Sequence, residues 1–117
     1  MAYVDGFLLA VPKDKLEEYK HAVAIAEPLF REFGAIDYVE CFGDDVPYGE
    51  LTSFPRAVMA KDDEIVVLSW IVYPSREVRD AAQKKAMADP RMMEAMQNTG
   101  IDGNRMIFGG FKPFVGL

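Results

Sequence analysis

The segment Glu64-Ile-Val-Val-Leu-Ser-Trp-Ile-Val-Tyr73 decides the fold of this chain. It is rich in β-branched and aromatic residues, which is typical of a β-strand. Apolar side chains occupy both faces of this strand, whereas a sheet with helices on one side normally alternates apolar with polar residues. The second face of the sheet is therefore predicted to be covered as well.

The neighbouring segments complete a β-α-β-β-α-β order. Further strands are expected at residues 2–11, 35–42 and 105–115, with helices at 14–33 and 75–88. A short helical segment is expected to restart at Asp89-Pro90. This order predicts an α+β, ferredoxin-like fold with an antiparallel sheet, formed by one domain of residues 1–117.

The first helix carries clear start and stop signals. Asp14 is the expected N-cap, with Glu17 at the third helical position, and Gly34 is the expected residue after the helix end. Between them an apolar stripe runs at helical spacing: Leu16, Tyr19, Val23, Ala26, Phe30 and Phe33. Ser75 is the expected N-cap of the second helix.

The doubly apolar third strand also bears on assembly. One 117-residue chain supplies only one such sheet, so a second copy is the expected cover for its open face. A homodimer is predicted, and a lone domain with an open hydrophobic face is the alternative.

Composition excludes several classes of protein. Apolar residues make up 50% of the chain, and 19 acids against 13 bases give a net charge of −6. No Lys or Arg lies between residues 32 and 55, where six acids fall. Without a basic face, neither nucleic acid nor an anionic membrane is an expected partner. No signal peptide, membrane span or cysteine pair is recognisable, which favours a cytoplasmic protein.

Several long segments carry a family resemblance. They include Asp37-Tyr-Val-Glu-Cys-Phe-Gly-Asp-Asp-Val-Pro-Tyr-Gly-Glu50, Ser69-Trp-Ile-Val-Tyr-Pro-Ser-Arg76 and Asp102-Gly-Asn-Arg-Met-Ile-Phe-Gly-Gly-Phe111. In these segments the chain resembles the YbaA-like family of bacterial proteins. The resemblance implies a dimeric α/β barrel, in which two ferredoxin-like sheets pack face to face. It implies no established activity, so no catalytic residue is carried over.

The connection between the second and third strands, residues 43–63, is far longer than a hairpin needs. Glycines and prolines punctuate it, and apolar residues such as Tyr48 are expected to anchor it. Two interpretations are open: a flap over a pocket between sheet and helices, or an arm that wraps the partner subunit.

Three carboxylates on the strands are candidate site residues. Asp37 and Glu40 are separated by an odd number of positions and should face opposite sides of their strand, which argues against a carboxylate pair. Each of them, like Asp5, must be paired, hydrogen-bonded or shifted in pKa if it is buried. Arg56 and Arg105 are the expected ion-pair partners. The candidate ligand-binding residues are Asp5, Asp37, Glu40, Tyr48, Arg56 and Trp70.

The pattern gives little indication of a metal, cofactor or nucleophile site. Asp44, Asp45 and Glu50 match no calcium-loop spacing, and His21 falls on the solvent side of its helix, so neither a metal site nor a cofactor is expected. Cys41 has no histidine partner and is interpreted as apolar filler. Trp70 is expected to anchor a sheet interface or to line a pocket. Four methionines suit an adaptable pocket or simple core filling: Met87, Met92, Met93 and Met96.

Three functions are compatible with this pattern. The first is a homodimer that binds a small apolar ligand, and the second is a cofactor-independent enzyme, monooxygenase- or isomerase-like, acting on small apolar or aromatic compounds. The third is a non-catalytic protein-interaction module. A buried polar pocket containing Asp5, Asp37 or Glu40 would favour the first two, and a core without a pocket would leave the third.

Overall fold

The computed structural model describes residues 1–117 and contains one four-stranded antiparallel sheet in the order β2-β3-β1-β4. The strands are β1 (Tyr3–Pro12), β2 (Asp37–Phe42), β3 (Glu64–Tyr73) and β4 (Ile107–Phe111). β3 and β1 are the two inner strands, paired along their whole length from Tyr3–Tyr73 to Pro12–Glu64. The expected ferredoxin-like order is confirmed.

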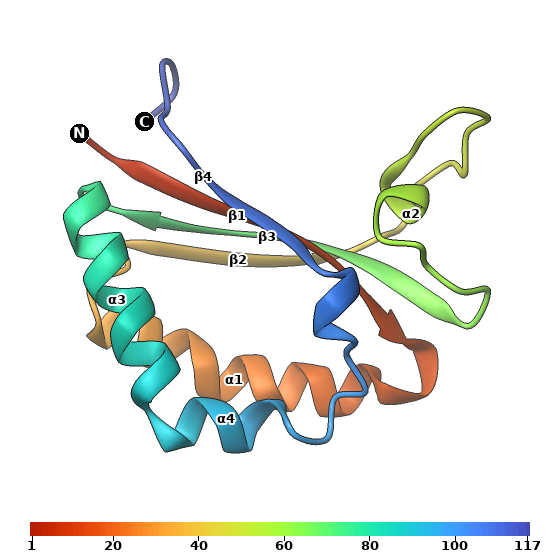
Figure 1. The fold of residues 1–117 in the computed structure, drawn as a ribbon, viewed down its shortest axis with the longest axis horizontal. Helices are drawn as coiled ribbons and strands as arrows, with labels where there is room; N and C mark the ends of the chain where they lie inside the picture. The colour runs from red at the N-terminus through yellow and green to blue at the C-terminus, as the bar shows by residue number, and fades with distance from the viewer.

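Three helices cover one face of the sheet: α1 (Leu16–Glu32), α3 (Arg76–Ala88) and α4 (Pro90–Met96) (Figure 1). A fourth, single-turn helix, α2 (Phe54–Ala57), lies on the opposite side of the sheet (Figure 1). Short 3-10 turns, Lys13–Lys15 and Gly103–Arg105, precede α1 and β4. None of the helices is both long and apolar enough to cross a membrane.

The helix ends match the sequence signals in all but one case. Gly34 has a φ of +122° after α1, and the side chains of Ser75 and Asp89 cap α3 and α4 as expected. The predicted capping role of Asp14 is wrong, because Asp14 lies inside the 3-10 turn. α1 starts after that turn with Lys15 at its N-cap and no side-chain cap.

Two strands are shorter than predicted. β2 starts at Asp37, because the Ala35 amide instead donates to the Phe30 carbonyl at the end of α1. β4 starts only at Ile107, because Arg105 belongs to the 3-10 turn capped by Asp102, and it ends at Phe111 rather than at residue 115.

The long loop between β2 and β3 packs on the sheet face opposite the helices. Its fully buried Val58 contacts Leu8, Ala10 and Val66, side chains that point away from α1. A loop in this position does not cover the space between sheet and helices, so its interpretation as a flap over that space is wrong.

The rest of this second face is open in the single chain. Leu68, Ile107 and Phe111 are 41%, 46% and 62% exposed. Leu68 belongs to the run of β3 that is apolar on both faces, so the expected unpaired apolar face is present on the chain.

Candidate functional site

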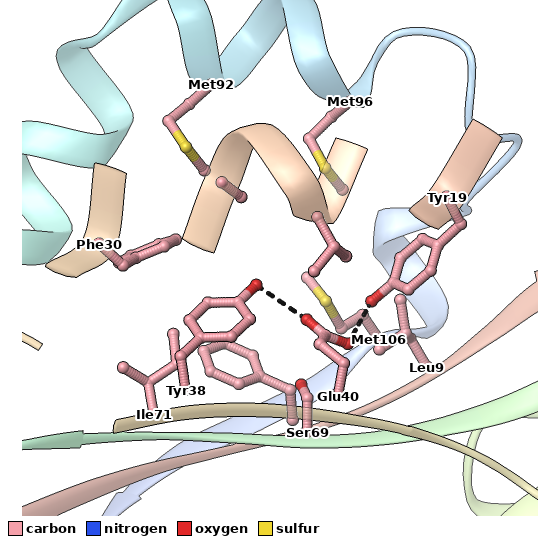
Figure 2. A pocket seen from close by; sticks show the side chains of 13 residues that line it. Leu9, Tyr19, Phe30, Tyr38, Glu40, Ser69, Ile71, Met92, Met96 and Met106 are labelled. Atoms are coloured by element: carbon pink, nitrogen blue, oxygen red, sulfur yellow. Dashed lines mark hydrogen bonds between the residues drawn. The ribbon is translucent and has the colours of Figure 1, made fainter. Parts of the chain in front are cut away.

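An apolar cavity of about 160 Å³ lies between the sheet and the helices (Figure 2). Eleven of its 13 lining residues are hydrophobic, and they come from β1, β2, β3, α1, α4 and the residue just before β4. Met92 and Met96 point into it from α4, and Met106 lies below them (Figure 2). The remaining lining residues are Phe7, Leu9, Tyr19, Val23, Ala26, Phe30, Tyr38, Glu40, Ser69 and Ile71.

The Glu40 carboxylate forms the polar end of this cavity. The Tyr19 hydroxyl donates to Oε1 at 2.6 Å, and the Tyr38 hydroxyl donates to Oε2 at 2.8 Å (Figure 2). Tyr38 and Glu40 share a face of β2 because they lie two positions apart, and Tyr19 lies in the apolar stripe of α1. Two elements thus hold the carboxylate from two directions.

Burial raises the pKa of the Glu40 carboxyl, and the two tyrosine hydrogen bonds oppose this shift only in part. Burial and the neighbouring Glu40 charge also raise the pKa values of Tyr19 and Tyr38, so both phenols stay protonated and act as donors. No Lys, Arg or His lines the cavity. The negative charge that Glu40 carries when ionised therefore has no counter-charge in the cavity.

Ser69 provides a second polar group beside Glu40. The two residues are directly opposite in the β2–β3 ladder, and Ser69 lines the cavity although it is only 4% exposed. Its hydroxyl takes part in none of the side-chain hydrogen bonds that hold Glu40. Glu40 and Ser69 are thus adjacent groups that can contact a molecule in the cavity.

Asp5 lies in a separate polar cluster outside this cavity. It is 2% exposed; Arg79 Nε of α3 lies 3.0 Å from Oδ1, and the Gln83 amide donates to Oδ2 at 3.2 Å. The Tyr3 hydroxyl contacts the same guanidinium at 3.2 Å. Burial raises the pKa of the Asp5 carboxyl even against the Arg79 charge.

The other predicted site residues are dispersed. Asp37 is exposed and 4.0 Å from Arg31. Arg56 stacks on the Tyr48 ring, 3.9 Å from its centroid, and binds the Tyr48 and Gly49 carbonyls within the loop. Trp70 is half-buried on the sheet face opposite Ser69.

Of the six predicted residues, only Glu40 lines the cavity, and the predicted arginine partners are wrong. Arg105 binds Glu64 instead, and Glu40 binds no cation at all. Sequence reasoning missed Tyr19, Tyr38 and Ser69 as site residues. The available signals were the alternation that places Tyr38 and Glu40 on one face and the α1 stripe that carries Tyr19.

The structure also places the methionines, His21 and the acidic residues of the long loop. Met92 and Met96 line the cavity, whereas Met87 and Met93 are 81% and 66% exposed. His21 is exposed, as expected from its place on α1. No three His, Cys, Asp or Glu side chains gather into a group that could hold a metal ion, so Asp44, Asp45 and Glu50 do not form one.

Residues 2–103 match the family described as "Protein of unknown function (DUF1428)". The chain belongs to this family. It is 55% identical over 115 residues to the uncharacterized protein YbaA of Escherichia coli strain K12, and the match covers 98% of each chain. The resemblance to the YbaA-like family that the sequence segments indicated is therefore confirmed.

Solved structures extend the fold to more distant proteins. A dimeric ferredoxin-like protein from an uncultured marine organism is similar at a TM-score of 0.64 and 11% identity, over 100% of this chain and 98% of that one. A mutant of SnoaB, a cofactor-independent oxygenase from Streptomyces nogalater, is similar at a TM-score of 0.61 and 13% identity, over 99% and 96%. At these identities the similarity shows the ferredoxin-like fold alone.

Proposed function

We propose that this protein binds a small, mainly apolar or aromatic molecule in the cavity between its sheet and its helices. The observation that carries the proposal is an apolar cavity of about 160 Å³ that ends in a tyrosine-held carboxylate. An apolar cavity of about 150 Å³ is large enough to bind benzene. A molecule with one six-membered ring therefore matches the size, and Glu40 supplies the orienting polar group that small-molecule sites generally contain.

Filling the cavity tests this proposal. Native mass spectrometry of protein purified from its host should show a retained small molecule. The variant Ala26→Leu, at a buried cavity-lining position of α1, should lose that molecule. Ala24→Leu, at an exposed position of the same helix, is the matched control and should retain it. Equal retention by both variants would refute binding in this cavity.

We further propose that residues 1–117 form one domain that pairs with a second copy through the open sheet face. The exposed Leu68, Ile107 and Phe111 support this pairing, and structural neighbours described as dimeric ferredoxin-like proteins are consistent with it. In that assembly two sheets pack face to face as a dimeric α/β barrel.

Light scattering after size exclusion should give twice the mass of one chain at micromolar concentration. Leu68→Asp should give the monomer, while Met93→Asp, at an exposed site on α4, should leave the dimer intact. A wild-type monomer would refute the homodimer without bearing on the cavity.

A second candidate function is a cofactor-independent enzyme that transfers a proton from a small aromatic compound. The buried Glu40 carboxyl favours it, because burial raises its pKa and makes the carboxylate a stronger base. 5-Nitrobenzisoxazole is a suitable probe, because removal of its ring C–H proton breaks the N–O bond and releases a coloured phenolate. Turnover that Glu40→Gln abolishes would support this candidate, and equal rates in both proteins would exclude it.

A further inference from the structure

Three buried or half-buried carboxylates lie on the sheet, and only one of them lacks a cation. Asp5 has Arg79 Nε at 3.0 Å, and Glu64 has Arg105 Nη1 at 2.7 Å. Glu40 has only two neutral phenols. The carboxylate without a cation is also the only one of the three that lines the cavity closed by Tyr19 and Tyr38.

The groups around Glu40 leave room for one more donor. Each carboxylate oxygen accepts a single tyrosine hydrogen bond and keeps further lone pairs. The Ser69 hydroxyl, opposite Glu40 on β3, offers another acceptor at the same end of the cavity. A group with several N–H donors and a positive charge complements both.

We propose that the cavity binds a small organic ammonium ion, a primary amine on an apolar or aromatic body, whose charge pairs with the Glu40 carboxylate. This inference rests on the proposed binding of a small molecule in the same cavity. One ammonium N–H donates to Glu40 and another to the Ser69 hydroxyl. The apolar body lies among the side chains of Phe30, Met92 and Met96.

Physical chemistry favours an ammonium over other ligands. A carboxylate ligand would meet the Glu40 charge in an apolar site with no cation to offset the repulsion. An alcohol can donate a hydrogen bond to Glu40 but leaves the buried charge uncompensated. Hydrogen bonds between charged groups are stronger than those between neutral ones, so the ammonium gains the most from this site.

The test compares benzylamine with benzyl alcohol, which have the same shape and number of heavy atoms. Isothermal titration calorimetry on the full chain should show that benzylamine binds at least about tenfold more tightly, as expected for a charge-assisted hydrogen bond. Cyclohexylamine and cyclohexanol form a second pair without an aromatic ring. Glu40→Gln should abolish the preference for the amine in both pairs, and Glu94→Gln, at an exposed position of α4, is the control.

The outcomes separate this inference from the proposed function. Equal affinity of amine and alcohol for the wild-type protein would overturn the ammonium assignment and leave small-molecule binding standing. Absence of binding by all four compounds, together with no molecule retained from the host, would overturn both. The comparison in the wild-type protein needs no variant, so it holds even if Glu40→Gln fails to fold.

Discussion

Glu64 and Glu40 are the same residue type on neighbouring strands of one sheet, yet their carboxyl groups behave in opposite ways. Arg105 binds both oxygens of Glu64 at 2.7 Å, and these hydrogen bonds lower its pKa to about 2. Two tyrosines bind the oxygens of Glu40 at 2.6 and 2.8 Å, and its pKa is raised. The distances are alike, but burial outweighs the two neutral tyrosine donors at Glu40, whereas the hydrogen bonds from the charged Arg105 outweigh burial at Glu64.

The comparison separates a structural carboxylate from a candidate site. Glu64 lies at the start of β3, where its bidentate pair ties the strand to the turn before β4. Its charge is already balanced within the chain. Glu40 faces a cavity with its charge unbalanced, which is the arrangement expected where a ligand completes the site.

Asp5 lies between these two cases. It has a guanidinium partner like Glu64, but burial still raises its pKa. The Asp5–Arg79 pair joins the inner strand β1 to α3, so it holds a helix on the sheet.

The largest expected effect is that of Arg79→Met. Removing the guanidinium leaves a carboxylate that is 2% exposed with only the Gln83 amide as donor. Loss of one partner of a buried pair typically costs about 3–5 kcal/mol. Urea unfolding should show a loss of this size. Arg76→Met, an exposed arginine on the same helix, should cost far less, and equal losses would contradict a structural role for the Asp5–Arg79 pair.

Glu64→Gln should have the next largest effect, with a defined dependence on pH. The Glu64 pKa falls from 4.5 to about 2 on folding, so the carboxylate stabilises the fold above pH 4.5 by about 3 kcal/mol, and this contribution is lost as the pH falls towards 2. The variant should therefore be less stable at pH 7 and approach the wild type in acid. Glu18→Gln, on the exposed side of α1, should show no such trend. A loss of unfolding free energy that is the same at every pH would contradict the ion-pair explanation.

The sequence predicted the fold well because the fold depends on local signals. The doubly apolar run of β3, the stripe of α1, and the caps Ser75 and Asp89 each indicate their element without knowledge of distant contacts. The errors lie at the ends of elements, where short-range turn and cap hydrogen bonds compete with strand pairing. The Ala35 amide donates to a carbonyl at the end of α1, so Ala35 does not belong to β2. Arg105 belongs to a 3-10 turn and not to β4.

The candidate site was predictable only in part. Strand alternation correctly separated Glu40 from Asp37. It could not reveal that the Tyr19 hydroxyl reaches Glu40 across the gap between helix and sheet, because that contact depends on how closely α1 packs. The choice of arginines failed for the same reason: Arg79 lies far along the chain from Asp5, and Arg105 lies far along the chain from Glu64.

Met96→Arg would remove the difference between Glu64 and Glu40 by placing a guanidinium at the cavity. Met96 points from α4 towards Glu40 (Figure 2). A guanidinium there should lower the Glu40 pKa and compete with an ammonium ligand, weakening benzylamine binding by about tenfold, or about 1.4 kcal/mol. Met93→Arg, three positions away and 66% exposed, is the control and should leave the affinity unchanged. Equal affinity in both variants would argue against Glu40 as the counter-ion.

The smallest expected effect is that of Glu40→Gln on stability, and its sign is opposite to that of Glu64→Gln. The Glu40 pKa is raised by folding, so the wild type loses stability as the pH rises from 4.5 through the folded-state pKa, whereas glutamine does not titrate. The groups that face the carboxyl, Tyr19 from α1 and Tyr38 from β2, stay protonated over this range. Glutamine exchanges two charge-assisted hydrogen bonds for neutral ones while avoiding a buried charge, and these opposing terms leave a net change of about 1 kcal/mol or less.

Chemical unfolding at several pH values should show that the free energy of unfolding of Glu40→Gln increases relative to that of the wild type as the pH rises. If the variant instead becomes less stable relative to the wild type as the pH rises, the fold stabilises the Glu40 carboxylate as it does that of Glu64. The charge at the cavity would then already be balanced.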